Sequence, residues 1–357
     1  MTNDQQDRIT DALIHQYEDD LNRDYNNDNI QTCADDAYAA YQDDWDDYIR
    51  QEGYKSPEER AYEQSLLKLQ ALTIDEMLNL EVPPREDILS PILQTQSLNM
   101  LFAKRGVGKT HVALGLSYAI ASGGAFLKWQ AAAPRKVLYI DGEMPAATMQ
   151  SRLRAIRDVS TSKAAADYLR IVNPDVNRLQ GMPDLSTADG QMHVQELISD
   201  AELVVVDNIS TLSRTGNENE AESWSNMQTW ALGLRAMGKS VLFVHHAGKG
   251  GQQRGTSRRE DVLDTVIELR HPNDYDPEQG ARFEVHFTKA RNLSGEATKP
   301  FEAHLHNGVW TFKDAEDVQR LRAEQLKQSG FSIHDIQEEM GISRATAYRL
   351  LQKTPKG

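Results

Sequence analysis

Cysteine is nearly absent from this sequence, which has Cys33 alone among 357 residues. A single thiol excludes an intramolecular disulfide framework and a zinc site built from several cysteines, so no primase-type zinc ribbon is expected. Long apolar runs are also missing, which argues against a membrane-spanning helix. Residues 1–16 contain neither a basic head nor an apolar core, so no signal peptide is expected. Together these absences predict a cytoplasmic protein with no membrane partner.

Negative charge is concentrated at one end of the chain. The formal net charge is −15, and residues 1–60 hold 17 acidic against 5 basic residues, a net charge of −12. The hydrophobic fraction of 39% is low for a chain that packs a core along its whole length. Residues 1–60 are therefore predicted to form an acidic, helical N-terminal arm. Two interpretations stay open for it: a solvated arm without a core, or a small docking module for a protein partner.

Residues 97–313 show short apolar runs that alternate with helical stretches. This alternation predicts an α/β core with a mostly parallel sheet that is covered by helices on both faces. Residues 61–96 are predicted to form a helical linker, in which the helix ends before Pro83-Pro84. Residues 314–357 are predicted to form a small all-α unit. The expected strands are 98–102, 136–140, 203–206, 241–244, 282–288 and 309–312, and the expected helices of the core include 112–121 and 221–237.

Residues 103–110 match a P-loop in which alanine replaces the first glycine. Small residues let successive backbone N–H groups approach a phosphate, while Lys109 supplies a positive charge and Thr110 a hydroxyl ligand for Mg²⁺. The helix that follows adds the partial positive charge of its N-terminus. The sequence therefore predicts ATP and Mg²⁺ as cofactors. The predicted nucleotide-binding residues are Ala103, Lys104, Arg105, Gly106, Val107, Gly108, Lys109 and Thr110.

Carboxylates end two of the expected strands. Asp207 follows the apolar run 203–206, a position suited to holding the Mg²⁺ that binds the phosphates. The run 137–140 ends in Asp141-Gly142-Glu143, which offers two carboxylates that can orient or deprotonate water. Thr110 and Asp207 are thus the candidate metal residues, while Glu143 and Asp141 compete for the role of base.

A P-loop strand, a helix and then a strand that ends in glutamate resemble the RecA-type ATPases. More narrowly, roughly residues 80–312 resemble the DnaB-type and plasmid RepA-type hexameric replicative helicases. The resemblance implies a RecA-like fold for 97–313, with Glu143 as the catalytic base. It also implies that His246, or alternatively His245, senses the γ-phosphate. Lys289 and Arg291 would act on the nucleotide of a neighbouring subunit, so the implied partner is a second copy of the chain in a ring, expected to be a hexamer.

The Gly-rich run 248–259 lies where this family presents a DNA-contacting loop to the ring channel. Its four basic residues and lack of acids suit contacts to the backbone of single-stranded DNA. Arg254 has a second interpretation as an inter-subunit finger, because RepA-type proteins have Arg-Gly here, and a merely solvated loop is the alternative for the whole run. The candidate single-strand contacts are Lys249, Arg254, Arg258 and Arg259.

Residues 329–351 resemble the helix-turn-helix of resolvase-type DNA-binding domains, which implies duplex DNA as a partner. Ser332 and Ser343 are expected to cap its two helices, and Gly341 lies where the turn needs a small residue. A helical hairpin that contacts another protein is the alternative. The candidate duplex contacts on the second helix are Arg344, Thr346 and Arg349.

These features predict an ATP-dependent DNA helicase or translocase of the RecA/DnaB type that acts in plasmid, phage or mobile-element replication. Two other functions stay open. The first is an ATP-regulated DNA-binding regulator that does not unwind DNA, which the helix-turn-helix resemblance favours. The second is a recombination ATPase of the RecA/RadA type, against which the lack of a recognisable polymerisation strand before the P-loop counts.

Overall fold

The computed structural model describes residues 71–178, 181–214, 220–247 and 260–352. The predicted acidic arm (1–60) and the predicted DNA-contacting run (248–259) lie outside the described residues. The chain divides into two units, residues 1–82 and 83–357. No helix within the described ranges has both the length and the apolar character needed to cross a membrane.

The described part of the first unit contains one short helix, α4 (Ile74–Leu78). Its N-terminus is closed by a capping box, in which the Thr73 hydroxyl accepts a hydrogen bond from the N–H of Glu76 and the Glu76 carboxylate accepts one from the N–H of Thr73. Asn79 is the C-cap. Within 71–80, the predicted helix is therefore limited to a little over one turn.

The second unit is built on a nine-stranded sheet with the order β13-β12-β11-β10-β3-β9-β8-β6-β7. The strands from β10 to β7 in this order are parallel, and β11, β12 and β13 continue the sheet in antiparallel fashion. The prediction of an α/β core with a mostly parallel sheet is therefore confirmed. The strands are β3 (Leu98–Ala103), β6 (Val137–Asp141), β7 (Leu169–Val172), β8 (Leu203–Asp207), β9 (Ser240–His246), β10 (Thr265–Arg270), β11 (Arg282–Ala290), β12 (Phe301–His306) and β13 (Val309–Asp314).

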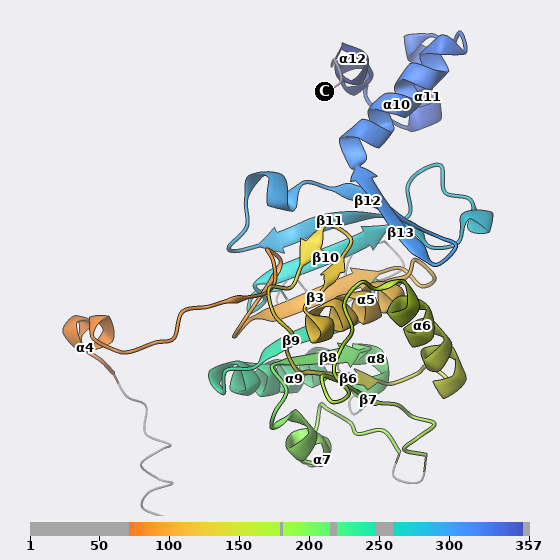
Figure 1. The fold of residues 1–357 in the computed structure, drawn as a ribbon. Helices are drawn as coiled ribbons and strands as arrows, with labels where there is room; N and C mark the ends of the chain where they lie inside the picture. The colour runs from red at the N-terminus through yellow and green to blue at the C-terminus, as the bar shows by residue number, and fades with distance from the viewer. Residues whose placement is uncertain (1–70, 179–180, 215–219, 248–259, 353–357) are drawn as a thin grey trace, which may run out of the picture. The chain divides into compact units, whose positions relative to one another are not determined.

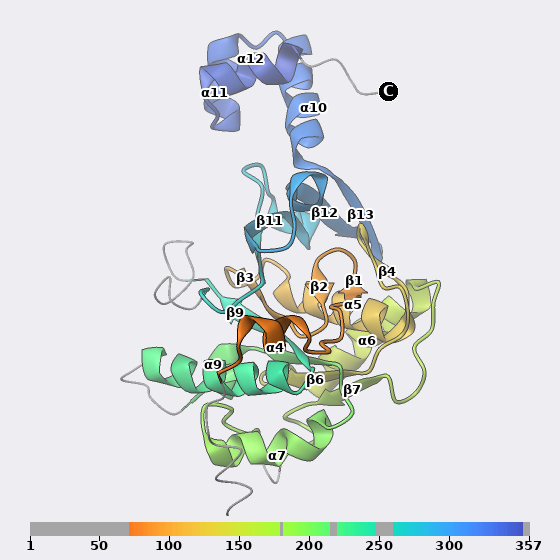
Figure 2. The same cartoon turned by 90° about the vertical axis from the view of Figure 1, so that its left-hand side faces the viewer.

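Helices cover both faces of the parallel strands (Figures 1 and 2). On one face, α5 packs in a core with Val137 and Tyr139 of β6, while on the other α9 packs with Leu138 and Ile140 of the same strand. This alternation follows from the two-residue period of a strand. The helices are α5 (Lys109–Ser122) and α6 (Ala146–Val159) on the first face, and α7 (Ala188–Ile198), α8 (Ile209–Leu212) and α9 (Glu220–Ala236) on the second.

Two small hairpins flank the central sheet. β1 (Asp87–Leu89) pairs with β2 (Leu93–Gln94), and β4 (Ala125–Phe126) pairs with β5 (Trp129–Gln130). The first hairpin corrects the prediction of a helical linker over 61–96, because its apolar residues are fully buried in the core beside α5 and pair as strands. Tertiary burial outweighs local helix propensity in so short a segment.

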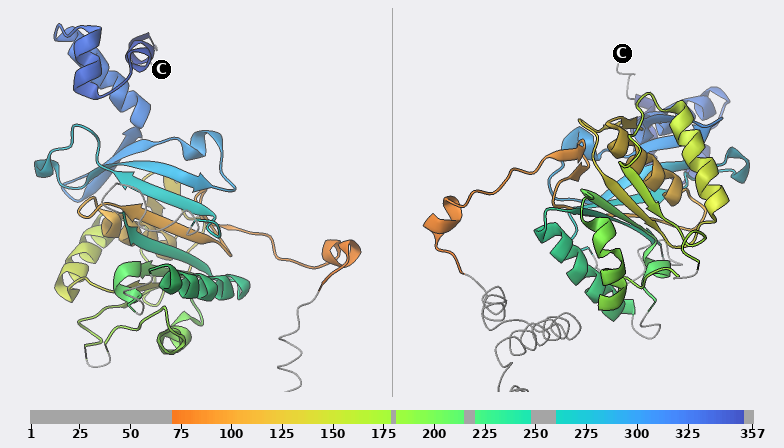
Figure 3. Two further views of the ribbon diagram at one scale, coloured as in Figure 1. Left: turned by 180° about the vertical axis from the view of Figure 1, so that it is seen from behind. Right: turned by 60° about the horizontal axis from the view of Figure 1, so that its bottom comes forward.

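Three helices follow the last strand, and α10 begins at the residue after β13 (Figure 3). They share a small core that includes Ile336, Ala347 and Leu350. The Ser332 hydroxyl caps α11 by accepting from the N–H of Asp335, and Gly341 ends this helix with a φ of +63°. The helices are α10 (Ala315–Gln328), α11 (Ile333–Met340) and α12 (Arg344–Gln352).

Candidate nucleotide-binding site

The loop between β3 and α5 has the backbone that a phosphate cradle needs. Gly106 and Gly108 adopt φ values of +84° and +121°, which side-chain-bearing residues rarely occupy. A Cβ on Gly108 would also lie 3.2 Å from the ring of Phe283 on β11. Glycine at this position therefore serves both the turn and the close packing of the loop against the sheet.

Lys109 is the first residue of α5, and its side chain folds back into the loop. Its ammonium donates hydrogen bonds at 3.1 Å to the carbonyl oxygens of Ala103 and Lys104. The residue is only 6% exposed, and this burial lowers its pKa to about 8, although the carboxylates of Asp207 and Glu143 oppose the shift. A buried cation held beside the loop that precedes a helix N-terminus suits an anionic phosphate.

Asp207 lies at the end of β8 and is almost fully buried. Its Oδ2 accepts a hydrogen bond of 2.6 Å from the hydroxyl of Tyr139, and its carboxylate also pairs with the hydroxyl of Thr110. Burial raises the pKa of Asp207 in spite of these donors. The fold thus brings together the two residues that were predicted to hold a metal.

The turn after β6 separates the two candidate bases. Asp141 is buried, and its carboxylate accepts hydrogen bonds from the N–H of Met144 at 3.1 Å and from the Asn173 amide at 2.9 Å. Burial raises the pKa of Asp141 to about 6. Glu143 is exposed, and its charge acts on both Lys109 and Asp207. Asp141 therefore holds the turn, while Glu143 is free to meet a water molecule.

Gly142 links this turn to the metal-side carboxylate. Its N–H donates a hydrogen bond of 2.7 Å to the carbonyl oxygen of Asp207. A Cβ at this position would lie 2.2 Å from the Thr211 hydroxyl oxygen. Glycine therefore leaves room for the side chains of α8 against this turn.

Two residues of this site escaped the sequence-based prediction. Tyr139 stands inside an apolar strand, where a tyrosine is usually read as core. Asn173 follows β7, a strand whose four residues are only partly buried and give a weak pattern. The one sequence signal for Tyr139 is that it lies two residues before Asp141, on the same face of β6.

The predicted phosphate sensor lies beside the loop. His246 ends β9 level with Ala103, and the N–H of Ala247 donates to the carbonyl oxygen of Ala103 at 2.8 Å. His245 is 3% exposed and, as the neighbouring strand residue, points to the opposite face. The geometry favours His246 over His245 as the histidine that belongs to this site.

Arg291 lies level with the start of β3, at the end away from the P-loop, and Lys289 lies level with the middle of that strand. Lys289 of β11 pairs with Val266 of β10, and Val266 pairs with Met100 of β3. The N–H of Arg291 donates a hydrogen bond to the carbonyl oxygen of Asp264. The N–H of Asp264 in turn donates to the carbonyl oxygen of Leu98, the first residue of β3. At about 3.3 Å per residue, the backbone of Arg291 is on the order of 15 Å or more from the P-loop. These cations therefore do not join the nucleotide site of their own chain.

The side chains of Lys289 and Arg291 bind backbone carbonyls instead. Lys289 donates to the carbonyl oxygens of Glu260 and Asp261, and Arg291 donates to that of Asp261. Burial lowers the pKa of Lys289, and the neighbouring Arg291 charge adds to the shift.

The predicted DNA contacts fall in two places. Arg344 and Arg349 are exposed on α12, Thr346 is partly exposed, and the Arg344 guanidinium lies 5.8 Å from the centre of the Tyr348 ring. Ser343 accepts a hydrogen bond from the N–H of Thr346 at 3.2 Å, as expected for its cap. The other predicted contacts, Lys249, Arg254, Arg258 and Arg259, lie outside the described residues.

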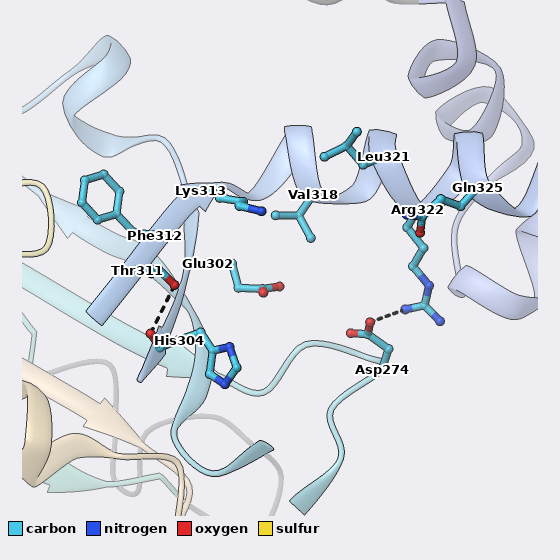
Figure 4. Close-up of a pocket in the computed structure, with 10 residues that line it drawn as sticks. All are labelled: Asp274, Glu302, His304, Thr311, Phe312, Lys313, Val318, Leu321, Arg322 and Gln325. Carbon is cyan, nitrogen blue, oxygen red and sulfur yellow. Dashed lines mark hydrogen bonds and ion pairs between the residues drawn. The ribbon is translucent and has the colours of Figure 1, made fainter. Parts of the chain in front are cut away.

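A cavity of about 380 Å³ lies between β12, β13 and α10, away from the P-loop (Figure 4). Asp274 forms ion pairs with Arg282 at 3.2 Å and with Arg322 of α10 at 3.1 Å. The pair with Arg322 joins the loop after β10 to α10, and the pair with Arg282 joins the same loop to β11. None of the residues that line the cavity belongs to the predicted nucleotide or DNA sites.

The residues at the P-loop fit a nucleotide with Mg²⁺. Lys109 and the N–H groups of the loop suit the phosphates, and the hydroxyl of Thr110 beside the buried Asp207 carboxylate suits a hard cation with oxygen ligands. In the described part of the chain, no cluster of three or more His, Cys, Asp or Glu side chains forms a separate metal site.

Two comparisons relate this chain to known proteins. The family model of the AAA domain matches residues 63–252, more than half of the chain. Among solved structures, a KaiC-like protein from the hyperthermophilic archaeon Pyrococcus horikoshii OT3 is similar, with 15% sequence identity and a TM-score of 0.45. The match covers 63% of this chain and 93% of that chain.

Proposed function

Because the chain belongs to the AAA domain family and is a P-loop ATPase, we propose that it is an ATP-driven DNA helicase or translocase. It works as a ring of identical subunits, a hexamer by analogy with the helicases that it resembles. Its role is in the replication of a plasmid, a phage or another mobile element.

The residues at the P-loop divide the work of hydrolysis. Lys109 and the loop N–H groups bind the phosphates, while Thr110 and Asp207 hold Mg²⁺, which when bound neutralises charge on the β- and γ-phosphates. Glu143 orients or deprotonates the attacking water. Asp141 is not suited to that role, because it already accepts hydrogen bonds from Met144 and Asn173. His246 senses the γ-phosphate from the end of the adjacent strand.

The proposal of a ring of subunits is supported by the distance between Lys289 and Arg291 and the P-loop of the same chain. A guanidinium that stabilises the charge of the transferred phosphoryl group must touch it. Arg291 lies level with the start of β3, whereas the P-loop follows the end of that strand. If these cations take part in hydrolysis, they serve the nucleotide of a neighbouring subunit.

The same cations support a coupling to single-stranded DNA. They bind the carbonyl oxygens of Glu260 and Asp261, which directly follow the basic run 248–259. A change at the subunit interface is thereby transmitted to the base of the run that carries Lys249, Arg254, Arg258 and Arg259. Hydrolysis would move this run along one strand of DNA.

The test combines ATPase and unwinding measurements on the full chain. ATP turnover is measured with and without single-stranded DNA, and a forked duplex is used to measure unwinding, with Lys109→Ala as the inactive control. Stimulation by single strands together with unwinding supports the proposal. ATP turnover that does not change with single-stranded DNA, together with tight binding to duplex sites, contradicts the proposal.

A second function is favoured by the C-terminal helices. Arg344 and Arg349 are exposed on α12, which follows the tight turn at Gly341, and such a surface can bind duplex DNA. In this alternative the protein is an ATP-regulated DNA-binding regulator, and ATP controls its assembly on a duplex site. The same pair of measurements separates the two functions, because a regulator binds the duplex without unwinding it.

A further inference from the structure

A buried tyrosine lies behind the predicted metal site. Tyr139 is in the middle of β6, is fully buried and belongs to the core beside α5. Its hydroxyl donates a hydrogen bond of 2.6 Å to Oδ2 of Asp207 on the neighbouring strand. Phenylalanine would fill the same space, and a buried hydroxyl costs free energy unless it is paired. The tyrosine oxygen is therefore explained by its partner and not by packing.

The register of the two strands explains why the pair forms. Asp141 of β6 is paired with Asp207 of β8, so Tyr139 lies one two-residue step before the strand end on the same face. Its long ring carries the hydroxyl forward to the Asp207 carboxylate, which also pairs with Thr110. Donors from a strand and from α5 thus fix this carboxylate from two directions.

We propose that Tyr139 is a positioning residue for the Mg²⁺ site, whose hydroxyl fixes the orientation of the Asp207 carboxylate toward the metal ion or its bound water. Partners that orient a metal-binding carboxylate raise metal affinity by one to two orders of magnitude in other sites. Tyr139 itself does not touch the nucleotide. The inference rests on the ATP·Mg²⁺ part of the proposed function and not on its DNA part.

Magnesium dependence distinguishes positioning from a merely structural role. A residue that only supports the fold affects nucleotide binding equally with and without Mg²⁺. A residue that orients Asp207 affects only the Mg²⁺-dependent part. The readout is therefore the affinity for a fluorescent ADP analogue in EDTA and across a Mg²⁺ titration, which requires no turnover.

The experiment compares the full-length wild type with Tyr139→Phe, and with Tyr118→Phe as the matched control. Tyr118 is another buried tyrosine, at 8% exposure, more than two helical turns along α5 from Lys109. We expect Tyr139→Phe to keep the wild-type affinity in EDTA and to need about tenfold more Mg²⁺ for half-maximal enhancement. Tyr118→Phe should follow the wild type throughout. An unchanged Mg²⁺ titration for Tyr139→Phe, or an equal loss with and without Mg²⁺, overturns the proposal.

A double variant covers the case in which Tyr139→Phe does not fold. The variant Asp207→Asn/Tyr139→Phe buries no unpaired carboxylate, and it is compared with Asp207→Asn alone. Equal Mg²⁺ responses support the proposal, because the tyrosine then acts only through Asp207, and a further loss overturns it. If the nucleotide affinity of the wild type did not change with Mg²⁺, both the ATP·Mg²⁺ function and the positioning role of Tyr139 would be overturned. A failure to unwind DNA would contradict the helicase proposal and leave the role of Tyr139 intact.

Discussion

The ammonium of Lys109 donates a hydrogen bond at 3.1 Å to the carbonyl oxygen of Ala103, so the two ends of the phosphate loop are joined by the lysine that is predicted to bind phosphate. The loop thus keeps its curvature through contacts within the chain. The cation is held in a buried place, which lowers its pKa to about 8. The positive charge of Lys109 thus favours phosphate binding, whereas its burial lowers the free energy of unfolding.

Replacing Lys109 with Met should separate these two effects. We expect ATP turnover to be lost, while the free energy of unfolding at pH 7 stays equal to that of the wild type or rises by up to about 3 kcal/mol. The reason is that a fall of the pKa from 10.5 to about 8 measures the free-energy cost of the buried charge. Urea denaturation followed by circular dichroism measures the difference.

The pH dependence of this effect has a definite sign. The folded-state pKa of Lys109 lies below the unfolded-state pKa, so the penalty is complete below pH 8 and is relieved as pH rises from about 8 to 10.5. The advantage of Lys109→Met should therefore shrink in that window. Lys327→Met, at an exposed position on α10, is the control and should show no such change. A Lys109→Met variant that is less stable than the wild type at pH 7 contradicts the prediction.

The contribution of Asp141 to the free energy of unfolding should change with pH in the opposite direction. Its folded-state pKa of about 6 lies above the ordinary aspartate value of 3.8, so its contribution to stability is present below pH 4 and is lost as pH rises through 6. The shift corresponds to about 3 kcal/mol. We expect the wild type to lose this amount relative to Asp141→Asn between pH 4 and pH 6.5, measured by urea denaturation at several pH values. If the free energies of unfolding of the two proteins changed in parallel with pH, the pKa of Asp141 would not be raised and the prediction would be wrong.

Glu143→Gln tests the choice between the two carboxylates. Glu143 is exposed near Lys109, so its removal should not disturb the turn that Asp141 holds. We expect nucleotide affinity close to wild type and turnover reduced by about 100-fold or more, as for loss of a general base. Single-turnover kinetics and nucleotide titration measure the two effects. Glu196 is an exposed carboxylate on α7, and Glu196→Gln is the control. If Glu143→Gln turned over ATP at the wild-type rate, Glu143 would be excluded as the base.

The parts of the site that could be predicted follow strong local patterns. The P-loop, Asp207 and the Asp141–Glu143 turn each directly adjoin a fully buried strand, β3, β8 or β6. A continuous apolar run that ends in a polar residue is readable without any knowledge of the neighbouring strands. The caps of the C-terminal helices at Ser332 and Ser343 are equally local.

The remaining parts depend on contacts between distant segments. β10 has the charged residues Glu268 and Arg270 in its second half, and these interrupt the apolar pattern of the strand. Once β10 lies between β3 and β11, Arg291 falls at the start of β3. Neither the strand order nor the Tyr139–Asp207 pair is encoded in sequence spacing, so both needed the structure.

Mixing two inactive variants tests the site shared between subunits. Arg291→Ala keeps an intact P-loop, and Lys109→Ala keeps an intact Arg291. If Arg291 acts on a neighbour's nucleotide, each variant alone is inactive, while a mixture regains part of the wild-type ATPase, because some interfaces combine an intact P-loop with an intact arginine. The measurement is ATPase activity against mixing ratio. A mixture as inactive as its components, in particles shown to contain both chains, contradicts action in trans.

The exposed arginines of α12 should govern affinity for duplex DNA and its salt dependence. Arg344 and Arg349 are exposed and carry one charge each. If both contact phosphates, Arg344→Ala/Arg349→Ala should weaken duplex binding and reduce the slope of log affinity against log salt concentration by about 2. Fluorescence anisotropy with a labelled duplex at several salt concentrations measures both. Lys327→Ala removes a charge from the neighbouring helix α10 and should leave the slope at its wild-type value. A double variant with the wild-type slope would show that α12 serves a protein contact instead of DNA.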